Sequence, residues 1–144
     1  KVFGIVHSGW KGTGIIKEAI MLANQKYGSA PSDFCVVIGP HINDCCYVVN
    51  EERATYFAKE FTPDCVKPIS KNQKIDWNNG EGQLFSLSLL KANLSVLEKI
   101  DVKDSNIAIC SDCTCCNQIY GSNRRETSQG NSFTVQAAFI YYKN

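Results

Sequence analysis

Two histidines occur in the 144 residues, His7 and His41. His7 directly follows a short apolar run that predicts a buried strand, and His41 follows a second such run after the Gly39-Pro40 that ends it. Ligands of α/β sheets collect at the carboxyl ends of strands, so both imidazoles stand where a metal or a substrate would bind. The alternative at each position is a loop histidine whose ring only hydrogen-bonds neighbouring backbone. The neighbours of His7 favour the functional interpretation there.

Residues 7–14 read HSGWKGTG and place three glycines within six positions. Such a segment turns sharply or lets its backbone approach a ligand closely. Trp10 adds an aromatic face and Lys11 a cation beside His7. The glycine spacing is neither a Walker loop nor a dinucleotide fingerprint, so it predicts no particular ligand by itself.

Eight cysteines form the second chemical feature, and six of them fall in two clusters, 45–46 and 110–116. Adjacent cysteines rarely bridge one another, so free thiols or metal ligands are favoured over disulfides. Free thiols indicate a reducing compartment, and we expect a cytoplasmic protein. The cluster Cys110-x-x-Cys113-x-Cys115-Cys116 resembles half of a zinc ribbon without its second half, and His41 with Cys45 is another possible ligand pair. Buried, unreactive thiols remain the alternative for both.

Arg124 and Arg125 lie together in a polar segment without periodicity. They are either two solvated charges or an anion clamp, because a guanidinium binds phosphate or carboxylate through two parallel hydrogen bonds. The overall charge is +1, with 15 basic and 14 acidic residues, which argues against nucleic-acid and membrane-surface proteins. No apolar run approaches the roughly 20 residues of a membrane-spanning helix.

The elements that position these residues alternate along the chain. Apolar runs predict strands over 2–6, 34–38, 106–110 and 133–142. Helical periodicity begins at Ile15, capped by Thr13 and closed by Gly28, begins again after Asn50 until Pro63, and is clearest over the leucines of 84–97. Residues 62–83, with Asn78-Asn79-Gly80, predict a loop with one short strand, and 111–131 lack a period. The alternation indicates one α/β domain over 1–144 with a mixed, partly parallel sheet.

Three segments together resemble one family. HSGWKGT at 7–13 is similar to the "HAGWRGT" signature of the YfiH-like, or laccase-domain, family. IGPHINDCCYVV at 38–49 resembles its "IGPxIGPCCYEV" segment, and residues 113–126 resemble its "CT … FFSYRRD" segment. The chain departs from these patterns at Val49, Asn123 and Asn131. The resemblance implies a CNF/YfiH-like α/β sandwich, of which 1–144 would be the C-terminal portion.

The resemblance also implies a metal site built from two histidines and one cysteine, of which His7 is one ligand. The other two belong to upstream family motifs that do not occur here, so we expect a separate N-terminal segment or chain to complete the site. Zinc is the expected metal, with copper as the alternative. The site residues carried over are His7 and Arg125 as catalytic, and Trp10, Lys11 and Arg124 as substrate-binding.

The activity implied by the family is phosphorolysis of purine nucleosides or methylthioadenosine, with possible deamination of adenosine. The substrates would be a purine nucleoside and phosphate, with neither nucleic acid nor a membrane as partner. The alternatives are a copper-dependent polyphenol oxidase, a peptidoglycan-precursor editing hydrolase, and a non-catalytic scaffold subunit. Multicopper oxidation needs many histidine ligands, and two are too few, so oxidase chemistry ranks below nucleoside chemistry.

Overall fold

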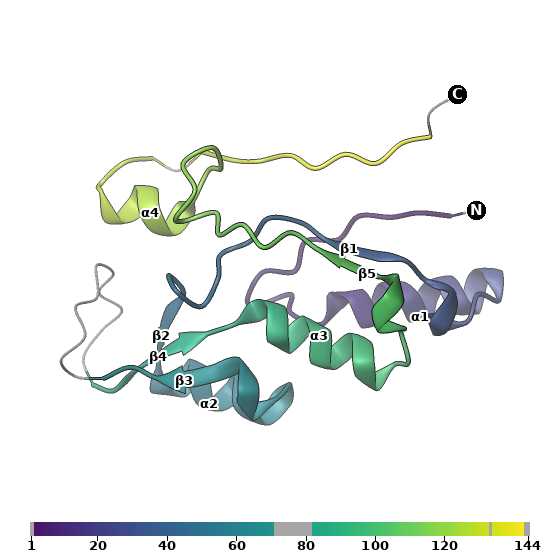
Figure 1. The fold of residues 1–144 in the computed structure, drawn as a ribbon, viewed down its shortest axis with the longest axis horizontal. Coiled ribbons are helices and arrows are strands. Elements are labelled where there is room, and N and C mark those ends of the chain that lie inside the picture. Colours follow the sequence, from purple (N-terminus) through teal and green to yellow (C-terminus); the bar gives the residue numbers. More distant parts are fainter. Residues whose placement is uncertain (1, 71–81, 133, 143–144) are drawn as a thin grey trace.

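The computed structural model describes residues 2–70, 82–132 and 134–142 of the chain. Helices and strands alternate along it (Figure 1). The helices are α1 (Ile15–Tyr27), α2 (Glu51–Glu60), α3 (Leu89–Lys99) and α4 (Asn123–Ser128). The strands are β1 (Val36–Ile38), β2 (Val48–Asn50), β3 (Val66–Pro68), β4 (Leu84–Leu87) and β5 (Ile107–Ile109), and short 3-10 helices span Pro31–Asp33, Pro63–Cys65 and Asp104–Asn106.

The strands form one parallel and one antiparallel sheet. β1 and β5 run in parallel, with Val36 opposite Ile107. The second sheet has the order β2-β4-β3 and is antiparallel throughout, with Val48 opposite Ser86 in its first pair. The predicted α/β class with a mixed arrangement of strands is therefore confirmed.

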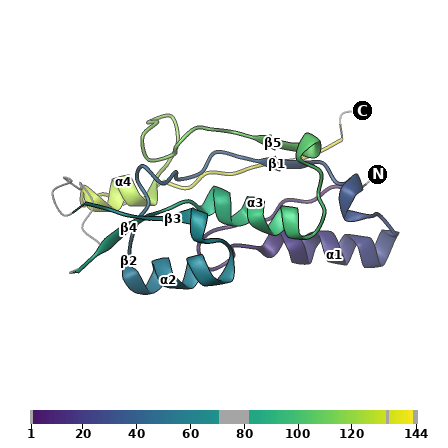
Figure 2. The same cartoon turned by 60° about the horizontal axis from the view of Figure 1, so that its bottom comes forward.

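Helices α1 and α3 cover one face of the β1–β5 pair (Figure 2). Ile20 of α1 and Leu97 of α3 are almost fully buried there against Val36 of β1. Because side chains alternate along a strand, Val37 points to the opposite face, where it is 77% exposed. The prediction that this strand is buried therefore holds for one face only, because Val37 is largely uncovered on the other.

The second core lies between the antiparallel sheet, α2 and α3. Phe57 of α2, Leu87 of β4 and Ala92 of α3 are fully buried in it. Side-chain caps start both helices: Asn50 accepts a hydrogen bond from the Arg53 N–H, as its position predicted, and Ser88 accepts one from the Lys91 N–H. These caps fix where β2 and β4 give way to helix.

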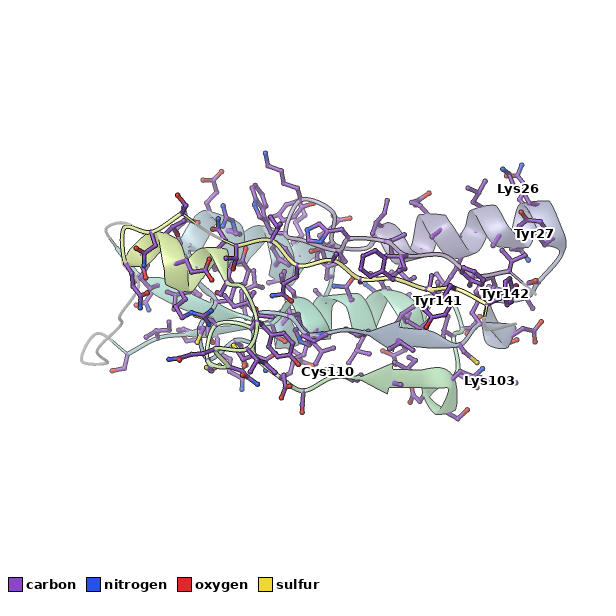
Figure 3. The ribbon with its side chains drawn as sticks, turned by 90° about the horizontal axis from the view of Figure 1, so that it is seen from above. Lys26, Tyr27, Lys103, Cys110, Tyr141 and Tyr142 are labelled. Atoms are coloured by element: carbon purple, nitrogen blue, oxygen red, sulfur yellow. The ribbon has the colours of Figure 1, made fainter. Side chains whose placement is uncertain are left out.

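The strands predicted at the two ends of the chain are wrong for the described residues. Residues 2–6 and 134–142 adopt no strand and are exposed, while Phe133 lies outside the described residues. A strand needs a neighbouring strand paired through backbone hydrogen bonds, and neither segment belongs to a sheet of the described chain. The two segments nevertheless meet, since the rings of Phe3 and Tyr142 lie 4.6 Å apart. Figure 3 shows Tyr141 and Tyr142 on the extended C-terminal segment.

Three further expectations need correction. The leucine-rich helix predicted from residue 84 is a strand up to Leu87, because β4 pairs with strands on both sides. The cap of α1 is Gly14 in a left-handed conformation, while the Thr13 hydroxyl donates to the Gly9 carbonyl. The aperiodic region 111–131 contains α4. The Gly28 cap and the short strand within 62–70 are confirmed, and Asn78-Asn79-Gly80 lies outside the described residues.

Candidate functional site

The segment that carries His7 is a compact glycine turn. The Gly12 N–H donates to the Gly9 carbonyl at 3.0 Å, and the Ile15 N–H donates to the Gly12 carbonyl at 3.0 Å. A Cβ on Gly9 would stand 2.9 Å from Nε2 of His7, so any other residue there would displace the imidazole. The glycine spacing thus clears space for the ring of His7, which is exposed.

Helix α3 holds this turn from beneath through one buried amide. The Asn93 side-chain oxygen accepts hydrogen bonds from the Ser8 hydroxyl at 2.8 Å and from the Gly14 N–H at 3.4 Å. Its amide nitrogen donates to the Leu89 carbonyl at 2.8 Å, which fixes the orientation of the group. The turn therefore has a defined position on the helix despite its glycines.

The expected aromatic face and cations lie together beside the turn. Lys11 places its ammonium 5.3 Å from the centre of the Trp10 ring, and the Arg53 guanidinium lies 4.1 Å from the same ring. Arg124 lies 5.2 Å from the ring of Tyr47. Burial lowers the pKa of Arg124, and the nearby charge of Arg53 lowers it further. Lys11 and Arg53 thus place positive charge beside Trp10, and Arg124 lies close enough to Arg53 for their charges to interact.

Arg53 is a residue that the sequence alone did not single out. It lies in the first turn of α2, where the sequence pattern predicts only a solvent-exposed charge on an amphipathic helix. Only the packing of α2 beside the turn brings it over Trp10. No local pattern in the sequence carries that information.

Arg125 holds a loop together. One terminal nitrogen donates to the Thr114 and Cys115 carbonyls at 2.8 and 2.9 Å, and the other donates to the Tyr120 carbonyl at 2.6 Å. The same guanidinium forms an ion pair with Glu126 at 3.3 Å. Its terminal donors are therefore engaged within the protein, in contrast to Lys11.

A groove of about 440 Å³ opens next to the turn, between α1, α2 and α3. Of the predicted site residues, Lys11 alone lines it, together with Lys17, Glu60 and Phe61 among others. The volume lies within the usual range for small-molecule pockets, about 300–1,000 Å³. His7 and Trp10 are not among its lining residues, so the groove extends the site rather than forming its centre.

His41 does not share a ligand group with Cys45. Its Nδ1 lies 2.9 Å from the Gly39 carbonyl, and its Nε2 is buried without a partner among the described residues. The backbone of His41 instead bridges to Cys113. Through that bridge the chain brings together four thiols, those of Cys45, Cys46, Cys113 and Cys116, within 4.8 Å of one another.

His7 belongs to no group of three or more potential ligands among the described residues, where the four thiols form the one such group. All eight cysteines are free, as expected from their spacing. No helix of the described chain combines the length and apolarity needed to cross a bilayer.

Comparison with known proteins places these features in a family. Residues 1–142 match the family model described as "Multi-copper polyphenol oxidoreductase laccase". The chain is 31% identical over 126 residues to the purine nucleoside phosphorylase YlmD of Geobacillus stearothermophilus, covering 85% of this chain and 43% of YlmD. It is 29% identical over 133 residues to a purine nucleoside phosphorylase of Borreliella burgdorferi, covering 90% and 52% respectively.

The fold is similar to that of solved relatives. The hypothetical protein YfiH of Bacillus licheniformis superposes with a TM-score of 0.69 at 26% identity, covering 88% of this chain and 45% of that one. The chain thus spans about half the length of the relatives it matches.

Proposed function

The chain belongs to the multi-copper polyphenol oxidoreductase laccase family, and we propose that within it the chain carries part of the active site of a metal-dependent purine nucleoside phosphorylase. The reaction breaks the bond between the purine nitrogen and C1′ of the ribose, forms a bond from a phosphate oxygen to C1′, and releases the free base. The names of the relatives from Geobacillus and Borreliella support this activity.

The observation that carries the proposal is the exposed imidazole of His7 on the same turn as Trp10 and Lys11, with Arg53 over the Trp10 ring and Arg124 within charge interaction of Arg53. Phosphorolysis needs a dianion held against a sugar that becomes positively charged, so positioning and charge stabilisation supply most of the catalysis. Lys11 and Arg53 provide free or partly exposed cations for the phosphate, and Arg124 adds to their potential. The Trp10 ring, 41% exposed, offers a surface on which a purine can stack.

Arg125 contributes to this site by position. It holds the loop from Thr114 to Tyr120 against the start of α4, next to Arg124. We therefore assign it the role of a positioning residue, and assign phosphate binding to Lys11, Arg53 and Arg124. Arg125 would affect the reaction through the placement of Arg124.

His7 fits the family's metal as one ligand of several. The ring is exposed, and Gly9 keeps the space beside Nε2 open. A zinc ion bound there would act as a Lewis acid on a substrate oxygen or on water; copper is the alternative that the family name suggests. Since one imidazole cannot hold such an ion alone, we propose that a segment or chain beyond these residues supplies the remaining ligands.

The uncovered apolar surface supports that completion. Val37, Val135 and Phe139 are each more than three-quarters exposed, and the last two lie on the extended C-terminal segment, which runs roughly along the length of β1 and β5 on their open side (Figure 1). Apolar patches of this kind mark surfaces that another polypeptide covers. The eight free thiols support a reducing compartment, and we propose the cytoplasm.

The test is the release of hypoxanthine from inosine by the protein together with its completing segment. Release that requires inorganic phosphate and yields ribose 1-phosphate supports phosphorolysis. Conversion of adenosine to inosine in the same preparation would add deaminase activity. Oxidation of a phenol without base release would establish the oxidase alternative and overturn the proposal.

A matched pair of variants locates the phosphate. Lys11→Met keeps the length of the side chain and removes its charge, so the KM for phosphate should rise about tenfold or more while the KM for inosine changes little. Lys103→Met, at an exposed position before β5, is the control and should leave both constants unchanged. If both variants changed the KM for phosphate equally, Lys11 would not be a phosphate-binding residue.

A further inference from the structure

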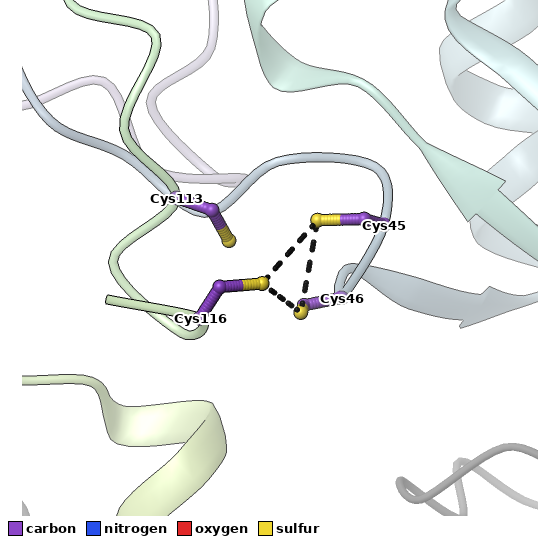
Figure 4. Close-up of side chains that lie close together, drawn as sticks. All are labelled: Cys45, Cys46, Cys113 and Cys116. Carbon is purple, nitrogen blue, oxygen red and sulfur yellow. Dashed lines mark hydrogen bonds between the residues drawn. The ribbon is translucent and has the colours of Figure 1, made fainter. Parts of the chain in front are cut away.

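We propose that Cys45, Cys46, Cys113 and Cys116 form a tetrathiolate site for Zn²⁺ that is separate from His7 and has a structural role. The four sulfurs lie within 4.8 Å of one another. Cys46 and Cys116 are 3.3 Å apart, Cys45 and Cys116 3.7 Å, and Cys45 and Cys46 3.8 Å (Figure 4). A tetrahedral Zn²⁺ with Zn–S bonds of about 2.3 Å separates its sulfurs by about 3.8 Å, so the cluster already has the size of such a site.

Two tight turns converge to place these thiols. In the first, the Cys46 and Tyr47 N–H groups both donate to the Asn43 carbonyl, at 3.0 and 2.9 Å. In the second, the Asn117 N–H donates to the Cys113 carbonyl at 2.9 Å, which makes Cys113-x-x-Cys116 a closed turn. The turns come from segments 70 residues apart, which is why the sequence revealed only half of the site.

Backbone contacts hold the two turns together without any metal. The Thr114 N–H donates to the His41 carbonyl at 2.9 Å, beside the bridge between His41 and Cys113. The Asn43 side chain donates to the Ser111 carbonyl at 2.9 Å. The sulfurs therefore converge because of the fold, which reduces the entropy lost when an ion binds.

The surroundings of Cys113 suit a thiolate ligand, whereas burial raises the pKa of the Cys45 and Cys46 thiols, which an ion would have to deprotonate on binding. The backbone N–H of Asn43 points at the sulfur of Cys113 at 3.4 Å, and such N–H···S contacts stabilise a metal-bound thiolate. Four thiolates around Zn²⁺ leave a net charge of −2, and Arg124 is close enough to Cys46 for its positive charge to offset part of that charge. Arg125 braces the second turn through the Thr114 and Cys115 carbonyls.

The exposure of the thiols gives an ion a path to the site. Cys46 and Cys113 are buried, whereas Cys45 and Cys116 are exposed. Cys115 is buried in one cluster with Cys46 and Cys113, beside Ile42, but its sulfur is not among the four that converge. Binding displaces one proton for each thiol that becomes a ligand.

A disulfide is the competing use of the same thiols. A disulfide would join Cys46 to Cys116, the closest pair. The thiols of Cys45 and Cys113 would then converge on the bridge without forming a bond. A zinc ion uses all four at once and joins the same two turns. The convergence of four sulfurs, rather than two, favours the metal.

The experiment is a titration of the reduced, metal-free protein with Co²⁺ and then Zn²⁺. We expect one equivalent of Co²⁺ to give the intense visible bands of a tetrahedral cobalt thiolate, and one equivalent of Zn²⁺ to abolish them. Cys116→Ser, at an exposed position, should weaken Co²⁺ binding by more than about 100-fold, since even outer-shell changes cost 10–100-fold. Cys35→Ser, at an exposed position outside the cluster, and His7→Ala should both bind as the wild type does.

Three outcomes would overturn the site. The first is an absence of cobalt thiolate bands while four or more thiols react with a disulfide reagent. The second is unchanged binding in Cys116→Ser, with circular dichroism showing that the variant is folded. The third is a Cys46–Cys116 disulfide in protein isolated from cells with its thiols trapped. Since His7 plays no part in the titration, failure here leaves the proposed phosphorylase function intact, and the reverse also holds.

Discussion

The single side chain of Arg125 stabilises the whole loop from Thr114 to Tyr120. Its guanidinium binds the carbonyls of Thr114, Cys115 and Tyr120, and it is largely buried. Arg125→Lys keeps the charge but loses the planar fork that reaches several carbonyls, so we predict a loss of about 3 kcal/mol in the free energy of unfolding. Urea denaturation measures this loss, with Lys103→Arg as the control. An unchanged midpoint would mean that the loop does not depend on the fork.

Glu126 links stability to pH at the same loop. The N–H groups of Ser122 and Thr134, which donate to its carboxylate, lower its pKa below the ordinary value of 4.5. A carboxyl whose pKa is lower in the folded protein stabilises it above the unfolded pKa and loses that effect as pH falls through the folded pKa. We predict that the wild type loses stability below about pH 4.5 more steeply than Glu126→Gln does.

The check is the urea midpoint measured from pH 6 down to pH 3 for both proteins. The control is Glu98→Gln, at an exposed position of α3, which should follow the wild type. Parallel pH profiles for wild type and Glu126→Gln would contradict the assigned role of Glu126.

At the scale of elements, α3 supports the glycine turn through Asn93. Removing the amide in Asn93→Ala leaves the Ser8 hydroxyl and the Gly14 N–H without their acceptor. We predict a loss of about 2 kcal/mol in unfolding free energy and faster hydrogen exchange at Gly14. Lys91→Ala, on the exposed side of the same helix, should change neither quantity. Wild-type exchange at Gly14 in Asn93→Ala would show that the turn is held by its glycines alone.

Elements with local signals could be predicted from the sequence, and elements that depend on partners could not. The end of helix α1 at Gly28 and the start of helix α2 at Asn50 could be predicted from these residues alone. β4 was mistaken for helix because Leu84 and Leu87 have helical spacing, and only pairing with β2 and β3 makes them a strand. The four-thiol cluster escaped prediction for the same reason, since a contact across 70 residues leaves no local pattern.

At the scale of the whole molecule, the exposed apolar face of the β1–β5 pair differs most from the surface of a typical globular domain. The end segments were predicted as strands because their composition is typical of buried strands. A partner that paired with these segments and covered them would turn them into such strands. We predict that the chain alone self-associates at micromolar concentration, and that Val135→Lys with Phe139→Lys, both at highly exposed positions, makes it monomeric. Sedimentation velocity measures this. A wild-type chain that stays monomeric throughout would argue that no partner covers the face.

The central claim is that His7 is a ligand and catalytic residue of a nucleoside site. The most direct measurement is the phosphate-dependent release of hypoxanthine from inosine by His7→Ala, in the protein with its completing segment. We predict a loss of activity of at least about 1,000-fold with an unfolding midpoint close to that of the wild type, because the ring is exposed. Retained activity, or lost activity explained by a lost fold, would contradict the claim.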